Sequence, residues 1–124
     1  MRRWLCSLVL MLGLMSVLAG CASTKAATPG EQALLDASQA LVTLSSSFVA
    51  TSQSYTAKCG ATPRQMSVAD CNAFIGFSNS FKREYASAVD DWKQARASGS
   101  GQAAVAQRVD GLNAKLKPYA DKAK

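Results

Sequence analysis

The stretch CNAFIGFSNSFKREYASAVDDWKQA, residues 71–95, decides the fold of this 124-residue chain. Its larger side chains recur at alternating steps of three and four residues, which places them on one stripe of an α-helix. The stripe consists of Cys71, Phe74, Ser78, Phe81, Tyr85, Ala88, Trp92 and Ala95. Ser67 and Asp70 provide an N-terminal cap, and the SGSG turn at residues 98–101 stops the pattern. The sequence therefore predicts a helix over residues 68–98.

A helix is also predicted before this stretch, over residues 29–57. Thr28, Pro29 and Glu31 have the order of a helix start, with a capping residue, a proline in the first turn and an acid at the third position. The same spacing then continues through Leu34, Ala37, Leu41, Leu44, Phe48, Thr51 and Tyr55. Gly60 and Pro63 are expected to break the helix.

A third helix is predicted after the SGSG turn, over residues 102–117. Its stripe consists of Val105, Val109, Leu112, Leu116 and Tyr119. Pro118 is expected to kink or terminate this helix, because proline lacks the backbone donor and its ring clashes with the carbonyl one turn earlier.

The three helices predict an all-α fold. No segment alternates polar and apolar residues with period two, so we expect no strand. Helices with heptad-like packing and short connections predict an antiparallel three-helix bundle that occupies residues 29–124. Six aromatic residues on the stripes are expected in its core: Phe48, Tyr55, Phe74, Phe81, Tyr85 and Trp92.

A second heptad stripe, formed by Leu35, Val42 and Val49, lies beside the first one on the predicted helix 29–57. Each helix of a three-helix bundle contacts two others and needs a broad apolar face, so we interpret this stripe as core. The alternative is an exposed strip that binds a partner or a second copy of the chain.

The N-terminus has the organisation of a secretory signal. Arg2 and Arg3 precede a nearly continuous apolar segment from Leu5 to Val17. That segment is shorter than the roughly 20 residues that a membrane-spanning helix needs. A charged start, a short apolar run and small residues at the end are typical of a cleaved signal peptide.

The sequence LAGC, residues 18–21, resembles the lipobox of bacterial lipoproteins. The resemblance implies that residues 1–20 are removed and that Cys21 carries a diacylglyceryl group and an acylated amino group. It also implies that Ala22 directs the chain to the periplasmic face of the outer membrane, with the inner membrane as the alternative. Several acyl chains together give firm anchoring. Residues 21–28 would then be an acylated flexible tether, and this covalent lipid is the only non-protein group expected.

Two cysteines remain after this assignment, because Cys6 leaves with the signal and Cys21 is acylated. An even pair in an oxidising compartment predicts a disulfide between Cys59 and Cys71, which would clip the first helical hairpin just past its first helix. A metal or redox pair is the alternative, but the spacing is not C-x-x-C and the chain contains no histidine.

The residues do not support a catalytic or metal site. Histidine, the commonest general base and metal ligand, is absent. Asp90 and Asp91 are adjacent carboxylates, but neighbours on a helix point about 100° apart. Loss of Arg2 and Arg3 lowers the net charge of the chain from +6 to about +4, and no basic helix concentrates that charge. We therefore expect neither an enzyme nor a nucleic-acid-binding protein.

The predicted function is that of a lipid-anchored periplasmic module, structural or protein-binding, whose partner is an unidentified envelope protein and whose oligomeric state the sequence leaves open. The segment SVADCNAFIGFSNSFKREYASAVDDWKQARASG, residues 67–99, resembles small helical lipoproteins of prophages and conjugative elements, which implies an exclusion protein as an alternative. A pilotin-like chaperone for an outer-membrane assembly is another. A fourth hypothesis, taken from the major outer-membrane lipoprotein, is linkage of the C-terminal Lys124 to peptidoglycan.

Overall fold

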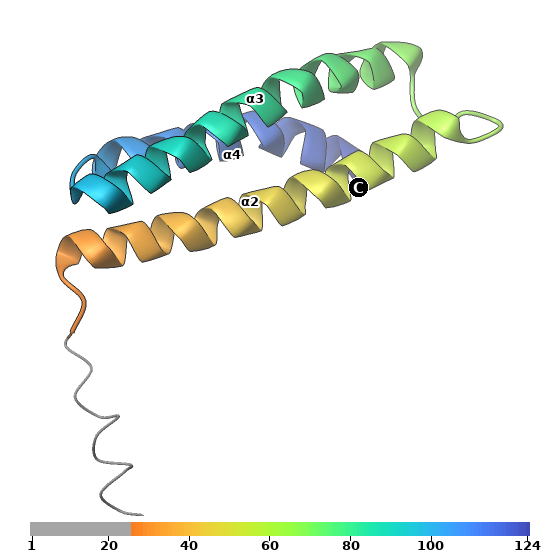
Figure 1. The fold of residues 1–124 in the computed structure, drawn as a ribbon. Helices are drawn as coiled ribbons and strands as arrows, with labels where there is room; N and C mark the ends of the chain where they lie inside the picture. The colour runs from red at the N-terminus through yellow and green to blue at the C-terminus, as the bar shows by residue number, and fades with distance from the viewer. Residues whose placement is uncertain (1–25) are drawn as a thin grey trace, which may run out of the picture.

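A computed structural model describes residues 26–124, which form three helices joined by short connections (Figure 1). They are α2 (Pro29–Gly60), α3 (Val68–Ser98) and α4 (Gln102–Ala123). Successive helices run in opposite directions, and each contacts both of the others. Within the described range there is no strand. The predicted all-α antiparallel three-helix bundle is therefore confirmed.

Local capping explains where the first two helices begin. At the start of α2, the Thr28 backbone N–H donates to Glu31 Oε2 at 2.7 Å and the Glu31 N–H donates to Thr28 Oγ1 at 3.3 Å. Bonding to Thr28 lowers the pKa of the Glu31 carboxyl. At the start of α3, Ser67 Oγ accepts from the Asp70 N–H at 3.0 Å. These reciprocal bonds satisfy donors that have no partner inside the helix.

The connection between α3 and α4 depends on two glycines. Gly99 has a φ of 71° and donates its N–H to the Ala95 carbonyl, and Gly101 has a φ of 88°. Residues with a side chain rarely adopt such positive φ values, so glycine allows the chain to reverse within three residues.

The core lies on the predicted stripes. Its buried cluster contains Leu34, Ala37, Leu41, Leu44, Phe81, Ala88, Ala95, Val105, Val109, Leu112 and Leu116. Ala88 is completely inaccessible to solvent, and Ala95, one heptad later on the same stripe, is 3% exposed. The heptad spacing therefore predicted which side chains are buried.

Aromatic rings fill the end of the bundle near the α2–α3 connection. Phe48 stacks on Phe81 with ring centroids 4.4 Å apart, and Tyr55 stacks on Phe74 at 4.0 Å. Phe77, which lies outside the predicted stripe, stacks on Tyr119 of α4 at 4.1 Å. Of the six aromatic residues expected in the core, Tyr55, Phe74 and Phe81 are buried, while the other three are partly buried and pack against it. Phe77 extends the cluster to the third helix.

Two helix ends differ from the prediction. Helix α2 continues to Gly60 rather than to residue 57, so Cys59 lies inside its last turn and not just past it. Helix α4 continues through Pro118 to Ala123 rather than ending at residue 117. Contacts with the other two helices explain this continuation, because Tyr119 packs on Phe77 and the Ala123 carbonyl accepts from Ser54 Oγ at 2.6 Å. These tertiary contacts outweigh the cost of the proline.

Candidate functional site

The proposed lipid attachment at Cys21 lies outside the described residues, as do the signal segment 1–20 and most of the tether. The described chain begins at residue 26, directly before the first turn of α2. Lipidation of Cys21 therefore stays a prediction.

The predicted disulfide is present. The sulfur atoms of Cys59 and Cys71 are 2.02 Å apart, and their Cα atoms are 6.0 Å apart. Cys59 lies in the last turn of α2, and Cys71 lies in the first turns of α3. The bond therefore fixes one end of the α2–α3 hairpin covalently, where residues 61–67 cross between the helices.

The interpretation of the second stripe as core is wrong. The exposed fractions are 57% for Leu35, 66% for Val42 and 49% for Val49. The reason is the position of the neighbouring helices, because Leu34 and Leu41, each one residue earlier, are already buried against them. One residue further around α2 no other described helix arrives. The alternative interpretation, an exposed apolar strip, is the correct one.

Helix α3 extends this strip into a face. Val68 and Ile75, one heptad apart, are 56% and 59% exposed. Together with Leu35, Val42 and Val49 they are all of the strongly exposed large apolar residues of the described chain. We call these five residues the uncovered face. Its members follow heptad spacing on both helices, so each helix presents them on one side.

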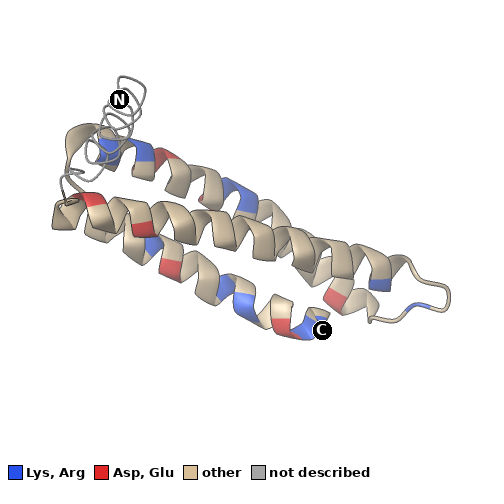
Figure 2. Cartoon of the chain, turned by 90° about the horizontal axis from the view of Figure 1, so that it is seen from below, with Lys and Arg blue, Asp and Glu red and all other residues tan. Residues whose placement is uncertain are grey.

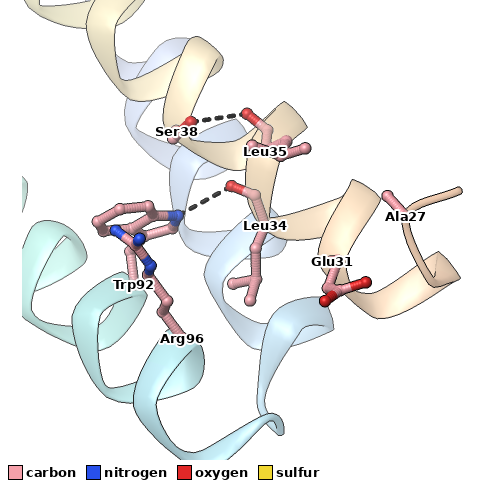
Figure 3. A pocket seen from close by; sticks show the side chains of 7 residues that line it. All are labelled: Ala27, Glu31, Leu34, Leu35, Ser38, Trp92 and Arg96. Carbon is pink, nitrogen blue, oxygen red and sulfur yellow. Dashed lines mark hydrogen bonds between the residues drawn. The ribbon is translucent and has the colours of Figure 1, made fainter. Parts of the chain in front are cut away.

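Two separate hollows lie between α2 and α3 on this side of the bundle, and we call the surface that spans both of them the groove. One end of the groove is lined by Leu35 and Ser38 of α2 and by Trp92 and Arg96 of α3 (Figure 3). At the other end, Ser52 and Thr56 of α2 oppose Ile75 and Lys82 of α3. Thr56 lies three heptads after Leu35, so both residues are on the same side of α2. The groove therefore follows one side of this helix from end to end.

Hydrogen bonds and a cation–π contact lie at the end of the groove near Trp92. The Trp92 indole nitrogen donates to the Leu34 carbonyl at 2.9 Å, and Ser38 Oγ donates to the Leu35 carbonyl at 2.8 Å (Figure 3). The guanidinium carbon of Arg96 lies 5.5 Å from the Trp92 ring centroid, within the range of a cation–π contact. Of these contacts, the bond from Trp92 to Leu34 joins the two sides of the groove.

Charge is unevenly distributed over the three helices. From Ala37 to Ala57, α2 has no charged side chain, whereas acids and bases are spread along α3 and α4 (Figure 2). Three ion pairs join α3 and α4 among the described residues. Arg108 contacts Asp91 at 2.9 Å, and Lys115 contacts Glu84 at 2.6 Å. The charged pairs therefore lie on the α3–α4 side of the bundle and leave the surface of α2 neutral.

The ion pair between Lys122 and Asp70 connects the end of α4 to the start of α3. The hydrogen bond from Lys122, together with the one from Ser67, lowers the pKa of the Asp70 carboxyl. The same bond raises the pKa of Lys122. Nearby, burial raises the pKa of the Tyr55 hydroxyl. These shifts belong to a structural contact between helix ends.

The neighbouring carboxylates Asp90 and Asp91 point to different partners. Asp90 pairs with Lys93 at 3.5 Å, while Asp91 pairs with Arg108 on the next helix. In the described part of the chain no three His, Cys, Asp or Glu side chains are grouped as metal ligands would be. Asp90 and Asp91 therefore do not converge on a shared partner.

The C-terminus is held against the bundle. Lys58 Nζ and Ser54 Oγ of α2 both donate to the Ala123 carbonyl, and Lys124 contacts Asp121 at 3.1 Å. The Lys124 side chain remains 80% exposed. Peptidoglycan linkage through Lys124 stays a prediction.

Helix α2 also meets the length and hydropathy criteria of a membrane-spanning helix, with a mean hydropathy of 1.3 over its most apolar 18 residues. In this fold its row from Leu34 to Tyr55 packs against α3 and α4, and 17% of that 18-residue window is buried.

The sequence predicted Leu35, Val42 and Val49 but not Val68 and Ile75, the other two residues of the uncovered face. It also did not predict the groove cations Lys82 and Arg96. The missed residues, together with Val89, repeat at intervals of seven along α3. That second repeat beside the core stripe was the signal that would have found them.

Comparisons with protein-family models, curated proteins and solved structures find no match to this chain.

Proposed function

We propose that this chain is a lipid-anchored periplasmic helical module that binds another envelope protein and performs no catalysis. The observation that carries the proposal is the uncovered face, because five large apolar side chains at least 49% exposed gather on one side of a small bundle. Apolar patches of this kind on a soluble domain are typical of interaction sites. The LAGC sequence supports the anchor, and the bonded cysteines suit an oxidising compartment.

Fractionation tests the anchor. Cys21→Ser removes the sulfur that would receive the lipid, so we expect the variant to leave the membrane fraction while the wild-type chain remains in it. The matched control is Ser23→Ala, which leaves the LAGC sequence intact. Equal membrane association of Cys21→Ser and wild type would refute the anchor.

The size of complexes extracted from membranes with mild detergent tests the binding role. We expect the tagged wild-type chain to migrate well above its own mass and Val42→Asp to migrate as the free chain. Ala104→Asp places the same charge on an exposed position of α4, and we expect it to behave as wild type. Migration of the wild-type chain as a free monomer would contradict the binding role.

A further inference from the structure

We propose that the groove between α2 and α3 binds one amphipathic helix of the partner, with acidic residues flanking its apolar stripe, and that this helix completes a four-helix bundle. The inference rests on the proposed protein-binding function and specifies the chemistry of the partner. It is carried by the shape of the groove, by its length and by its unpaired cations.

The shape of the groove suits a helix. On α2, Ser38 and Ser52 line the two hollows, and Ser45, at the same heptad position between them, is also small and half-buried. Larger apolar residues flank these serines, including Leu35 on one side and Ile75 on the other. A hollow of small side chains between apolar rows accepts the ridge of side chains on a neighbouring helix. Two packed helices with one open groove are also the arrangement that a fourth helix completes in bundles.

The length of the groove sets the length of its occupant. Leu35 and Thr56 line opposite ends and are 21 residues apart on one continuous helix. At a rise of 1.5 Å per residue the groove is about 30 Å long. A partner helix of about 20 residues, with three apolar heptads, would fill it.

The charge of the groove selects an acidic partner. Lys82 and Arg96 line it, two heptads apart, and neither forms an ion pair within residues 26–124. The carboxylate that lines the groove is Glu31, which already accepts from the Thr28 N–H. Acidic residues about 14 positions apart on the partner would meet the two cations. Complementary charge of this kind sets partner choice and orientation.

Two other occupants fit less well. A second copy would present the same groove, which is lined by the cations Lys82 and Arg96 and by Glu31, whose carboxylate is already bonded to Thr28, so it would bring cations rather than acids to this groove. Like charges placed together across an interface are costly. A bilayer surface is flat and would leave the serine-lined hollows unfilled, whereas a helix ridge fills them.

Site-specific photocrosslinking in intact cells tests the proposal. A benzophenone amino acid replaces Val42, or Ala104 on α4 as the control position, in the full lipid-anchored chain. Mass spectrometry then maps the crosslinked peptide. We expect Val42 to crosslink to a helical segment of another protein that has heptad-spaced apolar residues and acidic flanks, and Ala104 not to do so. A crosslink to a second copy, to lipid or to a segment without acidic residues would overturn the proposal, as would the absence of a crosslink.

Charge reversal separates groove binding from simple proximity. Lys82→Glu and Arg96→Glu should each lower the yield of the Val42 crosslink about tenfold, since they place like charges against the partner. Arg83→Glu makes the same change one residue outside the groove and should leave the yield unchanged. Replacing the mapped acidic residue of the partner by lysine should restore the yield with Lys82→Glu. Equal effects of the reversals at positions 82 and 83 would refute the acidic helix, while the size of the extracted complexes reports separately on whether any protein binds.

Discussion

The Trp92 indole nitrogen donates to the Leu34 carbonyl at 2.9 Å, although these residues are 58 positions apart in the sequence. The same contact recurs one heptad along, where the Tyr85 hydroxyl donates to the Leu41 carbonyl at 3.0 Å. Two donors on α3 therefore bond to two main-chain carbonyls on α2 with matching spacing. This repeat fixes the register of the antiparallel pair, which a row of apolar contacts alone specifies less strictly.

Removal of one register bond should destabilise the bundle. We expect Tyr85→Phe to lower the free energy of unfolding by about 1 kcal/mol, because it deletes a hydrogen bond and little else. Tyr55→Phe is the matched control. The Tyr55 hydroxyl is buried without a hydrogen-bond partner among the described residues, so its removal should be neutral or slightly stabilising. Urea denaturation measures both, and a larger loss from Tyr55→Phe would contradict the assigned bonds.

Val109 and Val42 test the difference in burial between the core and the uncovered face. Val109 is 4% exposed and Val42 is 66% exposed. We expect Val109→Ala to cost about 2 kcal/mol, since it removes buried apolar volume and leaves a cavity. The same change at Val42 should alter the stability of the isolated chain by less than about 0.5 kcal/mol. Similar losses at both positions would mean that Val42 belongs to the core.

The disulfide should contribute much of the stability of this small domain. Cys59 and Cys71 are separated by 12 positions. A disulfide that closes a loop of this size stabilises the folded chain by about 3 kcal/mol, because it reduces the conformational entropy of the unfolded chain. We expect the double variant Cys59→Ser/Cys71→Ser to lose about this amount in urea denaturation. Reductant should destabilise the wild-type chain similarly and leave the double variant unchanged. An unaltered unfolding midpoint would contradict the role of the bond as a clip.

The ion pair at Asp70 predicts a loss of stability in acid. Its pKa in the folded chain lies below the ordinary value of 3.8, because Lys122 and Ser67 bond to the carboxylate. This contribution is present above the unfolded pKa and disappears as the pH falls through the folded one. Melting temperatures between pH 5 and pH 2 should therefore fall less for Asp70→Asn than for wild type. Asp110→Asn, on the exposed surface of α4, serves as the control and should follow wild type. A wild-type slope for Asp70→Asn would exclude the pair as a stabilising contact.

The heptad stripes predicted the fold, because residues on the main stripe of each helix, such as Leu41 and Phe81, are buried between helices. The prediction for Val42 was wrong because the stripe alone does not show where the other helices lie. Periodicity shows that a helix has two adjacent apolar rows, but tertiary arrangement decides which of them the third helix covers. Pro118 shows the same limit at a helix end, since contacts made by Tyr119 and Ala123 keep α4 helical beyond it.

The candidate site was predictable in part. Cys59 and Cys71 were paired correctly, because a helical hairpin brings the end of one helix beside the start of the next. Lys82 and Arg96 were not recognised, since a lysine or arginine on a helix surface is usually only solvated. Whether such a residue lines a groove depends on which side chains of α2 lie opposite it, and this is defined only in the folded chain.

Footprinting with a carbene label in intact cells tests most directly whether the uncovered face is a binding site. In the purified chain we expect strong labelling of Val42 and Ile75, which are both more than half exposed. In cells we expect both residues to be protected, while Ala104 on α4 is labelled equally in the two samples. Equal labelling of Val42 and Ile75 inside and outside the cell would contradict the claim that a partner covers this face.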